Sequence, residues 1–294
     1  MSLFKGTATA LITPFLNGKI DYPGMGRLVE WQIKSGVDAL VVCGTTGEAS
    51  TLSGKERVQL TKFVVDLVDG RVPVIVGTGS NNTRFSTDLS REMESIGADG
   101  LLVVTPYYNK CTETGLMLHY EKIADSVNLP IILYSVPSRT GVNISPDTIK
   151  ALHLHPKICG IKEASGNIMQ ICEMAQYIHE DFAIYSGNDD MTIPIMALGG
   201  LGCISTVANI IPERYTAMTH QYLKGNVREA ASEQIALKPL IDILFKEINP
   251  VPLKSALNMM GLCQLEYRLP LCPPTNKTQY LLYDVLKGYG LVKN

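Results

Sequence analysis

The sequence of 294 residues is poor in the features that mark several common protein classes. Its 26 Lys and Arg nearly balance 28 Asp and Glu, so no excess charge attracts nucleic acid or an anionic membrane. Its seven cysteines are odd in number and scattered, without a C-x-x-C pair. This argues against a disulfide framework and favours a reducing compartment, the cytoplasm. No apolar run has the length of a membrane span, and the N-terminus lacks the apolar core of a signal peptide.

What the chain does contain is a recurring type of apolar segment. These segments are short, rich in β-branched residues and nearly continuously apolar, and each ends in small or polar residues. Parallel strands that are buried on both faces have this pattern. The segments lie at 7–14, 38–48, 73–80, 100–108, 130–137, 158–165, 182–189 and 202–209.

Helix signals occupy the stretches between the apolar segments. Ser53 is the expected N-cap of a helix over 52–70, and Glu56 three residues later completes a capping box. Ser145 is the expected N-cap of a second helix over 145–153. The chain therefore alternates strand and helix.

Eight strand–helix units predict an α/β fold, a (β/α)8 TIM barrel, over residues 1–225. Residues 226–294 have no strand-like segment and indicate a C-terminal helical region, with helices over 227–247, 250–261 and 275–290. The rival fold is a doubly wound open sheet. Its dinucleotide signature G-x-G-x-x-G is missing after the first strand, which favours the barrel.

The strand ends of a barrel carry its functional side chains. Lys162 ends a buried apolar segment, where burial favours the neutral amine that can form a Schiff base with a carbonyl substrate. The alternative is a lysine that reaches the rim and pairs with Glu163, and strand-end position alone leaves both open. Tyr134 ends the preceding segment, so it should neighbour Lys162 as a proton shuttle or be an ordinary core tyrosine.

Two further strand ends carry groups that could hold carboxylates. Thr45 and Thr46 precede Gly47, and two hydroxyls with tightly turned backbone N–H groups could bind an anion. Arg139 lies in a loop after Tyr134 and could clamp a carboxylate with two parallel hydrogen bonds. The plainer interpretations are a threonine-rich turn and a solvated loop arginine.

No metal site is expected. His153 and His155 form an H-x-H pair, but they precede a strand, at the barrel end away from the chemistry. No cluster of histidines, cysteines and carboxylates has metal-ligand spacing.

Six motifs together resemble the dihydrodipicolinate synthase family of pyruvate-dependent class I aldolases, in the N-acetylneuraminate lyase superfamily. They follow the family's order and spacing, and the resemblance covers essentially the whole chain. It implies a (β/α)8 barrel with C-terminal helices, usually in a homotetramer built as a dimer of dimers. The motifs are GTTGE at 44–48, GTGSN at 77–81, VTPYYNK at 104–110, YSVPSRTG at 134–141, GIKEASG at 160–166 and SGND at 186–189.

The resemblance implies catalytic roles for four residues. Lys162 matches the lysine that captures pyruvate as a Schiff base, and Tyr134 matches the tyrosine that relays protons. Thr46 matches the threonine that hydrogen-bonds this tyrosine. Tyr108 matches a tyrosine that a neighbouring subunit lends to the relay.

The resemblance also implies substrate-binding residues. Thr45 and Thr46 match the binders of the pyruvate carboxylate, and Arg139 matches the arginine that receives the carboxylate of L-aspartate 4-semialdehyde. Gly187 and Ile204 match backbone positions that line the pocket. No cofactor is implied, because the lysine itself serves as the electron sink.

The implied reaction condenses pyruvate with L-aspartate 4-semialdehyde to 4-hydroxy-tetrahydrodipicolinate, which commits carbon to diaminopimelate and lysine. N-acetylneuraminate lyase and oxo-sugar-acid aldolases share the lysine and the tyrosine. They tend to have Ser-Thr at the first motif and no arginine in the loop, so Thr45-Thr46 and Arg139 favour the synthase. A non-catalytic sensor of pyruvate or amino acids is the alternative from a different class.

Regulation by lysine is one property in which the chain departs from part of the family. Lysine-inhibited members bind the amino acid with two histidines and a glutamate, among other residues. Here Gly54 and Arg57 stand at the histidine positions, and Phe85 stands at the glutamate position. An unpaired ammonium beside a phenyl ring is costly, so we expect insensitivity to lysine.

Overall fold

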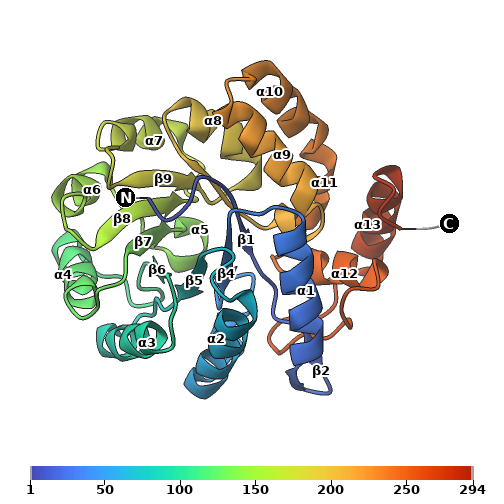
Figure 1. Cartoon of the computed structure of the whole chain (residues 1–294), viewed down its shortest axis with the longest axis horizontal. Coiled ribbons are helices and arrows are strands. Elements are labelled where there is room, and N and C mark those ends of the chain that lie inside the picture. Colours follow the sequence, from blue (N-terminus) through green and yellow to red (C-terminus); the bar gives the residue numbers. More distant parts are fainter. Residues whose placement is uncertain (1, 293–294) are drawn as a thin grey trace.

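Eight parallel strands form a closed barrel at the centre of the protein, in a computed structural model that describes residues 2–292 (Figure 1). The strands are hydrogen-bonded in the order β1-β10-β9-β8-β7-β6-β5-β4, and β4 closes the circle onto β1. Each coincides with one of the eight predicted segments, so the predicted barrel is confirmed. The strands are β1 (Gly6–Ala10), β4 (Ala39–Val42), β5 (Val74–Gly77), β6 (Gly100–Val104), β7 (Ile131–Ser135), β8 (Ile158–Glu163), β9 (Ala183–Ser186) and β10 (Gly202–Ser205).

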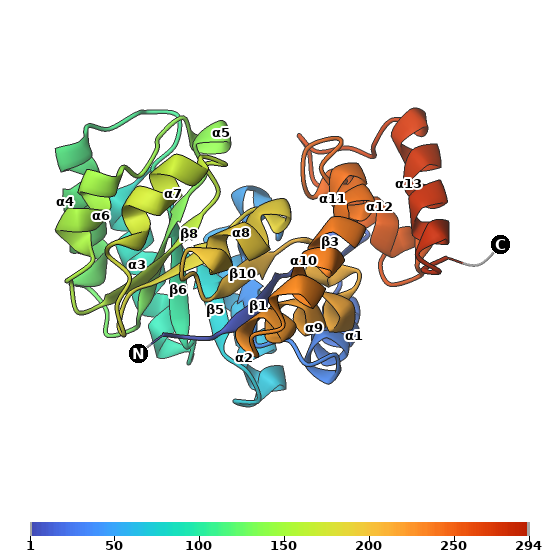
Figure 2. The same ribbon diagram turned by 90° about the horizontal axis from the view of Figure 1, so that it is seen from above.

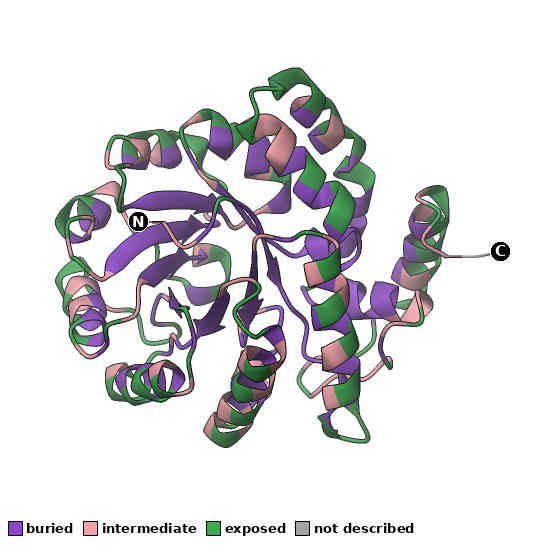
Figure 3. Cartoon of the chain, viewed as in Figure 1, coloured by how far each residue is buried: buried purple, intermediate pink, exposed green. Residues whose placement is uncertain are grey.

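Helices surround the barrel and shield the strands from solvent. Figure 3 shows buried residues on the helix sides that face the strands and exposed residues on the outer sides. Within residues 2–292, no helix combines the length and apolar character that crossing a membrane requires. The outer helices are α1 (Tyr22–Lys34), α2 (Gly54–Val68), α3 (Thr83–Ser95), α4 (Glu113–Ala124), α5 (Pro137–Thr140), α6 (Pro146–Leu152), α7 (Ile168–Ala175), α8 (Thr192–Ala197) and α9 (Pro212–Leu223).

The helix starts confirm the local signals in the sequence. The Ser53 hydroxyl accepts a hydrogen bond from the Glu56 N–H at 3.2 Å, and the Glu56 carboxylate accepts one from the Ser53 N–H at 2.9 Å. Ser145 caps α6 in the same way, through the N–H of Thr148. In the described residues, one-turn 3₁₀ helices follow the strands β4, β9 and β10. They are η1 (Ala49–Thr51), η2 (Asp189–Met191) and η3 (Val207–Asn209).

The C-terminal region is helical, but its first predicted helix is wrong. Instead of one helix over 227–247, α10 (Val227–Ala236) and α11 (Lys238–Leu244) are separated at Leu237. Pro239 lies in the first turn of α11 and cannot continue a helix, because it lacks an N–H and its ring clashes with the carbonyl four residues earlier. The remaining two helices, α12 (Val251–Met259) and α13 (Asn276–Gly288), lie where the sequence predicts them.

The C-terminal helices pack against the barrel on the side of α1 and α9 (Figure 2). One apolar cluster joins them: Ile12 and Leu28 come from the barrel side, and Leu240, Leu253 and Leu282 come from α11, α12 and α13. All five side chains are buried to 99% or more. The region therefore shares a hydrophobic core with the barrel.

A small hairpin that the sequence analysis missed follows β1. It consists of β2 (Phe15–Leu16) and β3 (Lys19–Ile20), joined by Asn17 and Gly18, both with φ in the left-handed region. Asn-Gly is the preferred pair for such a turn, so a signal was present. The backbone N–H groups of Asn17 and Gly18 donate to the carboxylate of Glu266, at 2.8 and 2.5 Å. The hairpin is thereby tied to the C-terminal region.

Candidate active site

Lys162 and Tyr134 lie side by side at the ends of neighbouring strands. Tyr134 on β7 is the register partner of Lys162 on β8. The Lys162 Nζ lies 4.5 Å from the centre of the Tyr134 ring, and both residues are only 6% exposed. The expected neighbourhood is confirmed, and the alternative ion pair between Lys162 and Glu163 is absent from the described residues. Glu163 accepts instead from the N–H of Ser165 at 2.6 Å, while its burial raises the pKa of its carboxyl.

The space around the Lys162 side chain depends on a glycine. Gly187 follows β9, and a Cβ atom at this position would lie 3.1 Å from the Lys162 Cε and 2.7 Å from the Ala164 Cβ. A larger residue would therefore push on the lysine stem. Ile204 on β10 is fully buried in the same interior cluster as Tyr134. Gly187 thus lies against the lysine, and Ile204 lies in the barrel interior with Tyr134.

A cavity of about 700 Å³ opens at this end of the barrel. Four of the predicted site residues line it: Thr45, Tyr108, Tyr134 and Arg139. The other four, Lys162, Thr46, Gly187 and Ile204, are not part of its lining. Tyr134 connects the two groups, because it lines the cavity and its ring lies against the lysine amine. Within residues 2–292, no group of three or more His, Cys, Asp or Glu is arranged to hold a metal ion.

Tyr108 is unlike the other residues at the cavity. Its side chain is 89% exposed, and its backbone has φ of +71°, a region that residues with a bulky side chain rarely occupy. Because the ring is so exposed, packing against residues 2–292 does little to offset the strain of this backbone conformation.

The loop after β4 directs its two threonine side chains differently. Thr45 is partly exposed and lines the cavity. Thr46 is buried, and its hydroxyl accepts a hydrogen bond from the Asn249 Nδ2 at 3.0 Å and lies 3.5 Å from the Thr206 hydroxyl. The predicted contact between the Thr46 hydroxyl and Tyr134 is not among these bonds. Of the two threonines, only Thr45 shares the cavity wall with Tyr134.

Asn249 was not found by sequence reasoning, yet it joins two predicted site residues. It lies between α11 and α12 and lines the cavity. Its side chain donates to Thr46, and its backbone carbonyl accepts a hydrogen bond from the Arg139 Nη2 at 3.0 Å. It stands 203 positions from Thr46 in the sequence, so no local pattern could have indicated the contact.

A buried ion pair holds the C-terminal end of the loop after β4, residues 43–48, which we call the threonine loop. The Lys254 Nζ of α12 lies 2.5 Å from the Glu48 Oε1, and both side chains are fully buried. The ammonium also lies 4.3 Å from the centre of the Phe15 ring, a favourable contact for a desolvated cation. Burial lowers the pKa of Lys254, and the nearby Glu48 carboxylate opposes this shift.

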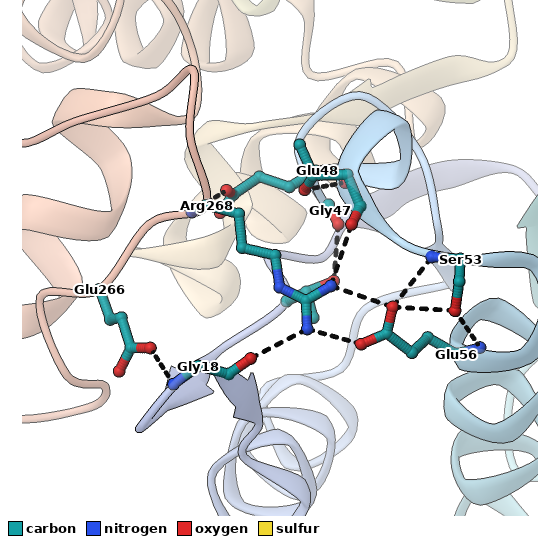
Figure 4. Close-up of polar contacts among 9 residues, drawn as sticks. Gly18, Gly47, Glu48, Ser53, Glu56, Glu266 and Arg268 are labelled. Carbon is teal, nitrogen blue, oxygen red and sulfur yellow. Dashed lines mark hydrogen bonds and ion pairs between the residues drawn. The ribbon is translucent and has the colours of Figure 1, made fainter.

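Arg268 extends this connection to the start of α2 (Figure 4). Its guanidinium donates to both oxygens of Glu56, at 2.5 and 3.0 Å, and to the carbonyls of Thr51 and Gly18, at 2.9 and 3.1 Å. Its backbone N–H donates to the Glu48 Oε2 at 3.3 Å. The hydrogen bonds from Arg268, together with those from Ser53, lower the pKa of Glu56 to about 2. Residues 249–268 therefore hold the threonine loop at several points.

Arg57, which also lines the cavity, stands at one of the positions that the sequence resemblance links to lysine binding. Its side chain is buried, the Nη2 donates to the Ala49 carbonyl at 2.5 Å, and the Cζ lies 5.8 Å from the centre of the Phe85 ring. Gly54 is the first residue of α2. Arg57 and Phe85, two of the three residues that differ from the lysine-inhibited members, thus contact each other.

Comparisons with known proteins agree on one family. The model of the dihydrodipicolinate synthetase family matches residues 3–288. A 4-hydroxy-tetrahydrodipicolinate synthase from Thermoanaerobacter sp. (strain X514) is 50% identical over 294 residues, covering 100% of this chain and 99% of the relative. One from Clostridium acetobutylicum is also 50% identical, over 293 residues, with 100% of both chains covered. The crystal structure of the Thermotoga maritima dihydrodipicolinate synthase superposes with a TM-score of 0.96 at 44% identity, covering 99% of this chain and all of that one.

The Arg268–Glu56 ion pair makes a pH-dependent contribution to stability. The folded-state pKa of Glu56 lies below its ordinary value of 4.5, so the ionised carboxylate stabilises the fold above that value, and the contribution is lost as pH falls through about 2. Arg268→Ala should therefore lower the urea midpoint near neutral pH, and the gap to the parent protein should narrow in acid. Arg84→Ala, which removes a surface pair with Asp88, is the control. If the difference in urea midpoint between Arg268→Ala and the parent protein stays constant with pH, the ion pair with Glu56 is not the source of this stability.

Proposed function

The chain belongs to the dihydrodipicolinate synthetase family, and from this we infer that it is a lyase that condenses pyruvate with L-aspartate 4-semialdehyde. The product is 4-hydroxy-tetrahydrodipicolinate, at the first committed step of the diaminopimelate and lysine pathway. The observation that carries this proposal is the buried amine of Lys162 against the ring of Tyr134 at the strand ends. A desolvated amine beside a phenol is suited to imine chemistry.

The proposed reaction begins on Lys162. Its neutral amine attacks the carbonyl carbon of pyruvate, and loss of water leaves an imine. The imine makes the pyruvate methyl group acidic, so a proton leaves and an enamine forms. The enamine carbon attacks the aldehyde carbon of the semialdehyde, whose oxygen takes up a proton. The amino group of the semialdehyde then attacks the imine carbon, the ring closes, and Lys162 leaves as the free amine.

Tyr134 and the threonine loop serve this sequence of proton transfers. Tyr134 lies within reach of the lysine amine and carries protons to and from the reacting nitrogen and oxygen. Thr46 is proposed as a hydroxyl of the relay and, with Thr45, as a binder of the pyruvate carboxylate. Thr45 and Tyr134 line the same cavity, which supports the Thr45 hydroxyl as the one next to Tyr134. A comparison of Thr45→Val with Thr46→Val therefore tests which threonine serves the proton relay and which serves only to bind the carboxylate.

The second substrate is proposed to bind further out. Arg139 lines the cavity and is fixed at one nitrogen by the carbonyl of Asn249, which leaves its remaining donors for the carboxylate of the semialdehyde. Gly187 and Ile204 complete the space around the lysine.

We propose that the site works only in an assembly. The exposed ring of Tyr108 is suited to enter the site of a second subunit, where its hydroxyl would join the relay of Tyr134. A homotetramer made of two such dimers is the proposed form. Seven free cysteines support a reducing compartment, and so a cytoplasmic location.

Imine trapping tests the proposed function directly. Pyruvate with borohydride should add one covalent adduct per chain, and Lys162→Ala should abolish both the adduct and nearly all turnover while the fold remains. Lys150→Ala, an exposed lysine on α6, is the control and should trap normally. Trapping and turnover that survive in Lys162→Ala would end the proposal.

Subunit complementation tests the role of Tyr108. Tyr108→Phe and Lys162→Ala should each be nearly inactive, but mixed dimers pair one intact lysine site with an intact tyrosine from the partner. Random exchange should restore about a quarter of the parent activity, because half of the dimers then carry one complete site. Tyr280→Phe, exposed on α13, is the matched control. If mixing restores nothing, Tyr108 does not act across the interface.

Lysine should not inhibit this enzyme at millimolar concentration. The ammonium group of a bound lysine would find Phe85 where lysine-inhibited members have a carboxylate, and the like-charged guanidinium of Arg57, which contacts Phe85, would repel it. A lysine titration of an assay coupled to the next reductive step checks this, with the coupling enzyme alone as the control. Saturable inhibition would show that other side chains rebuild the site.

A further inference from the structure

Among residues 226–292, Asn249 is the one whose hydrogen bonds reach residues proposed for both substrates. Resting on the proposed function, we propose that Asn249 is a positioning residue. Its carboxamide sets the direction of the Thr46 hydroxyl, so that this hydroxyl donates a hydrogen bond to the carboxylate of pyruvate. No local sequence pattern points to this role, and the contact depends on how the C-terminal helices close over the barrel mouth.

The side chain of Asn249 is enclosed. The residue is 7% exposed, and its Nδ2 lies 3.0 Å from the Thr46 Oγ1 in a buried hydrogen bond. The Oδ1 has no partner among the described residues. An amide held in this way has little freedom to rotate, so it imposes one geometry on the hydroxyl it touches.

In the structure the nitrogen of the amide, and not its oxygen, faces Thr46. One N–H of Nδ2 donates to the Thr46 hydroxyl, and the Oδ1 lies on the other side of the amide without a partner among residues 2–292. Turned over, the amide would accept from Thr46 and neither N–H group of Nδ2 would have that partner. The observed orientation therefore makes Asn249 the donor and Thr46 the acceptor.

The direction of this bond decides what the Thr46 hydroxyl can do. A hydroxyl has one proton and two lone pairs, so a hydroxyl that accepts from Asn249 keeps its proton for another partner. The other neighbour given by the structure, the Thr206 hydroxyl, lies at 3.5 Å, too far for a strong bond. A substrate carboxylate is acceptor-only and forms the stronger, charge-assisted bond. Asn249 thus prepares Thr46 as a donor to an anion.

The same residue supports Arg139 through a different atom. The Arg139 Nη2 donates to the backbone carbonyl of Asn249 at 3.0 Å, and a side-chain substitution leaves this carbonyl in place. Changes in the carboxamide should therefore affect pyruvate and spare the semialdehyde. A purely structural role for Asn249 would not separate the two substrates.

Asn249→Asp tests the proposal with almost no change in shape. The carboxylate cannot donate, so Thr46 must turn its proton toward Asp and away from pyruvate. The KM for pyruvate should rise about tenfold or more, the scale of one lost hydrogen bond, and borohydride trapping should need correspondingly more pyruvate. The KM for the semialdehyde should change less than about twofold. Asn249→Ala, which removes the donor without reversing the bond, should have a smaller effect on pyruvate.

Two further variants complete the design. Asn258→Asp is the matched control, because this asparagine of α12 donates to the Cys263 carbonyl at 2.9 Å, away from the threonines, and both KM values should stay unchanged. In a Thr46→Val background no hydroxyl remains to be directed, so Asn249→Asp should add little to the pyruvate KM. This non-additivity identifies a coupled pair.

The outcomes separate this inference from the proposed function. If the parent protein traps no pyruvate, the proposed function fails before Asn249 is tested. If it traps pyruvate, then equal shifts in both KM values, an unchanged pyruvate KM in Asn249→Asp, or an undiminished effect in the Thr46→Val background would overturn the role of Asn249. Should Asn249→Asp not fold, the same comparisons with Asn249→Ala decide.

Discussion

The ion pair between Lys254 and Glu48 is the contact on which the arrangement of the site depends. Two fully buried charges each lose several kcal/mol of hydration in effective terms, and only close pairing with further hydrogen bonds offsets that loss. The second oxygen of Glu48 accepts from the Arg268 N–H, and the ammonium lies over the Phe15 ring. Removing one partner would leave an uncompensated charge at about 3–5 kcal/mol. The threonine loop is therefore held from outside the barrel.

The fold could be predicted from the sequence wherever its physical cause is local. Strands buried on both faces must be apolar throughout, so eight such segments indicate a barrel, and the order of strands then places Tyr134 beside Lys162. The capping box at Ser53 is equally local. The break between α10 and α11 also has a local cause, Pro239. The apolar spacing continues across this proline, and for that reason it predicts one helix instead of two.

The rest of the site could not be predicted because its causes are distant in sequence. Asn249 meets Thr46 across 203 positions and Lys254 meets Glu48 across 206, and both contacts arise from the way the C-terminal helices pack on the apolar cluster around Leu253. The resemblance to a family indicated Thr46 as a partner of Tyr134, yet its hydroxyl points to Asn249. A motif specifies which residues stand together in sequence, whereas hydroxyl direction depends on tertiary packing.

The distance in sequence between Thr46 and Asn249 also has a consequence during synthesis of the chain. At about 5–20 residues per second, roughly 10–40 s separate the emergence of the threonine loop from that of its C-terminal partners. Strands β5 to β10 are made within this interval, after β1 and β4, so all eight strands are present before the loop meets its partners. A chain that ends before these helices would lack both the hydrogen bond that Asn249 gives to Thr46 and a large part of the apolar core that the barrel shares with them. The last part of the chain to be made therefore completes both the apolar core and the hydrogen bonds of the threonine loop.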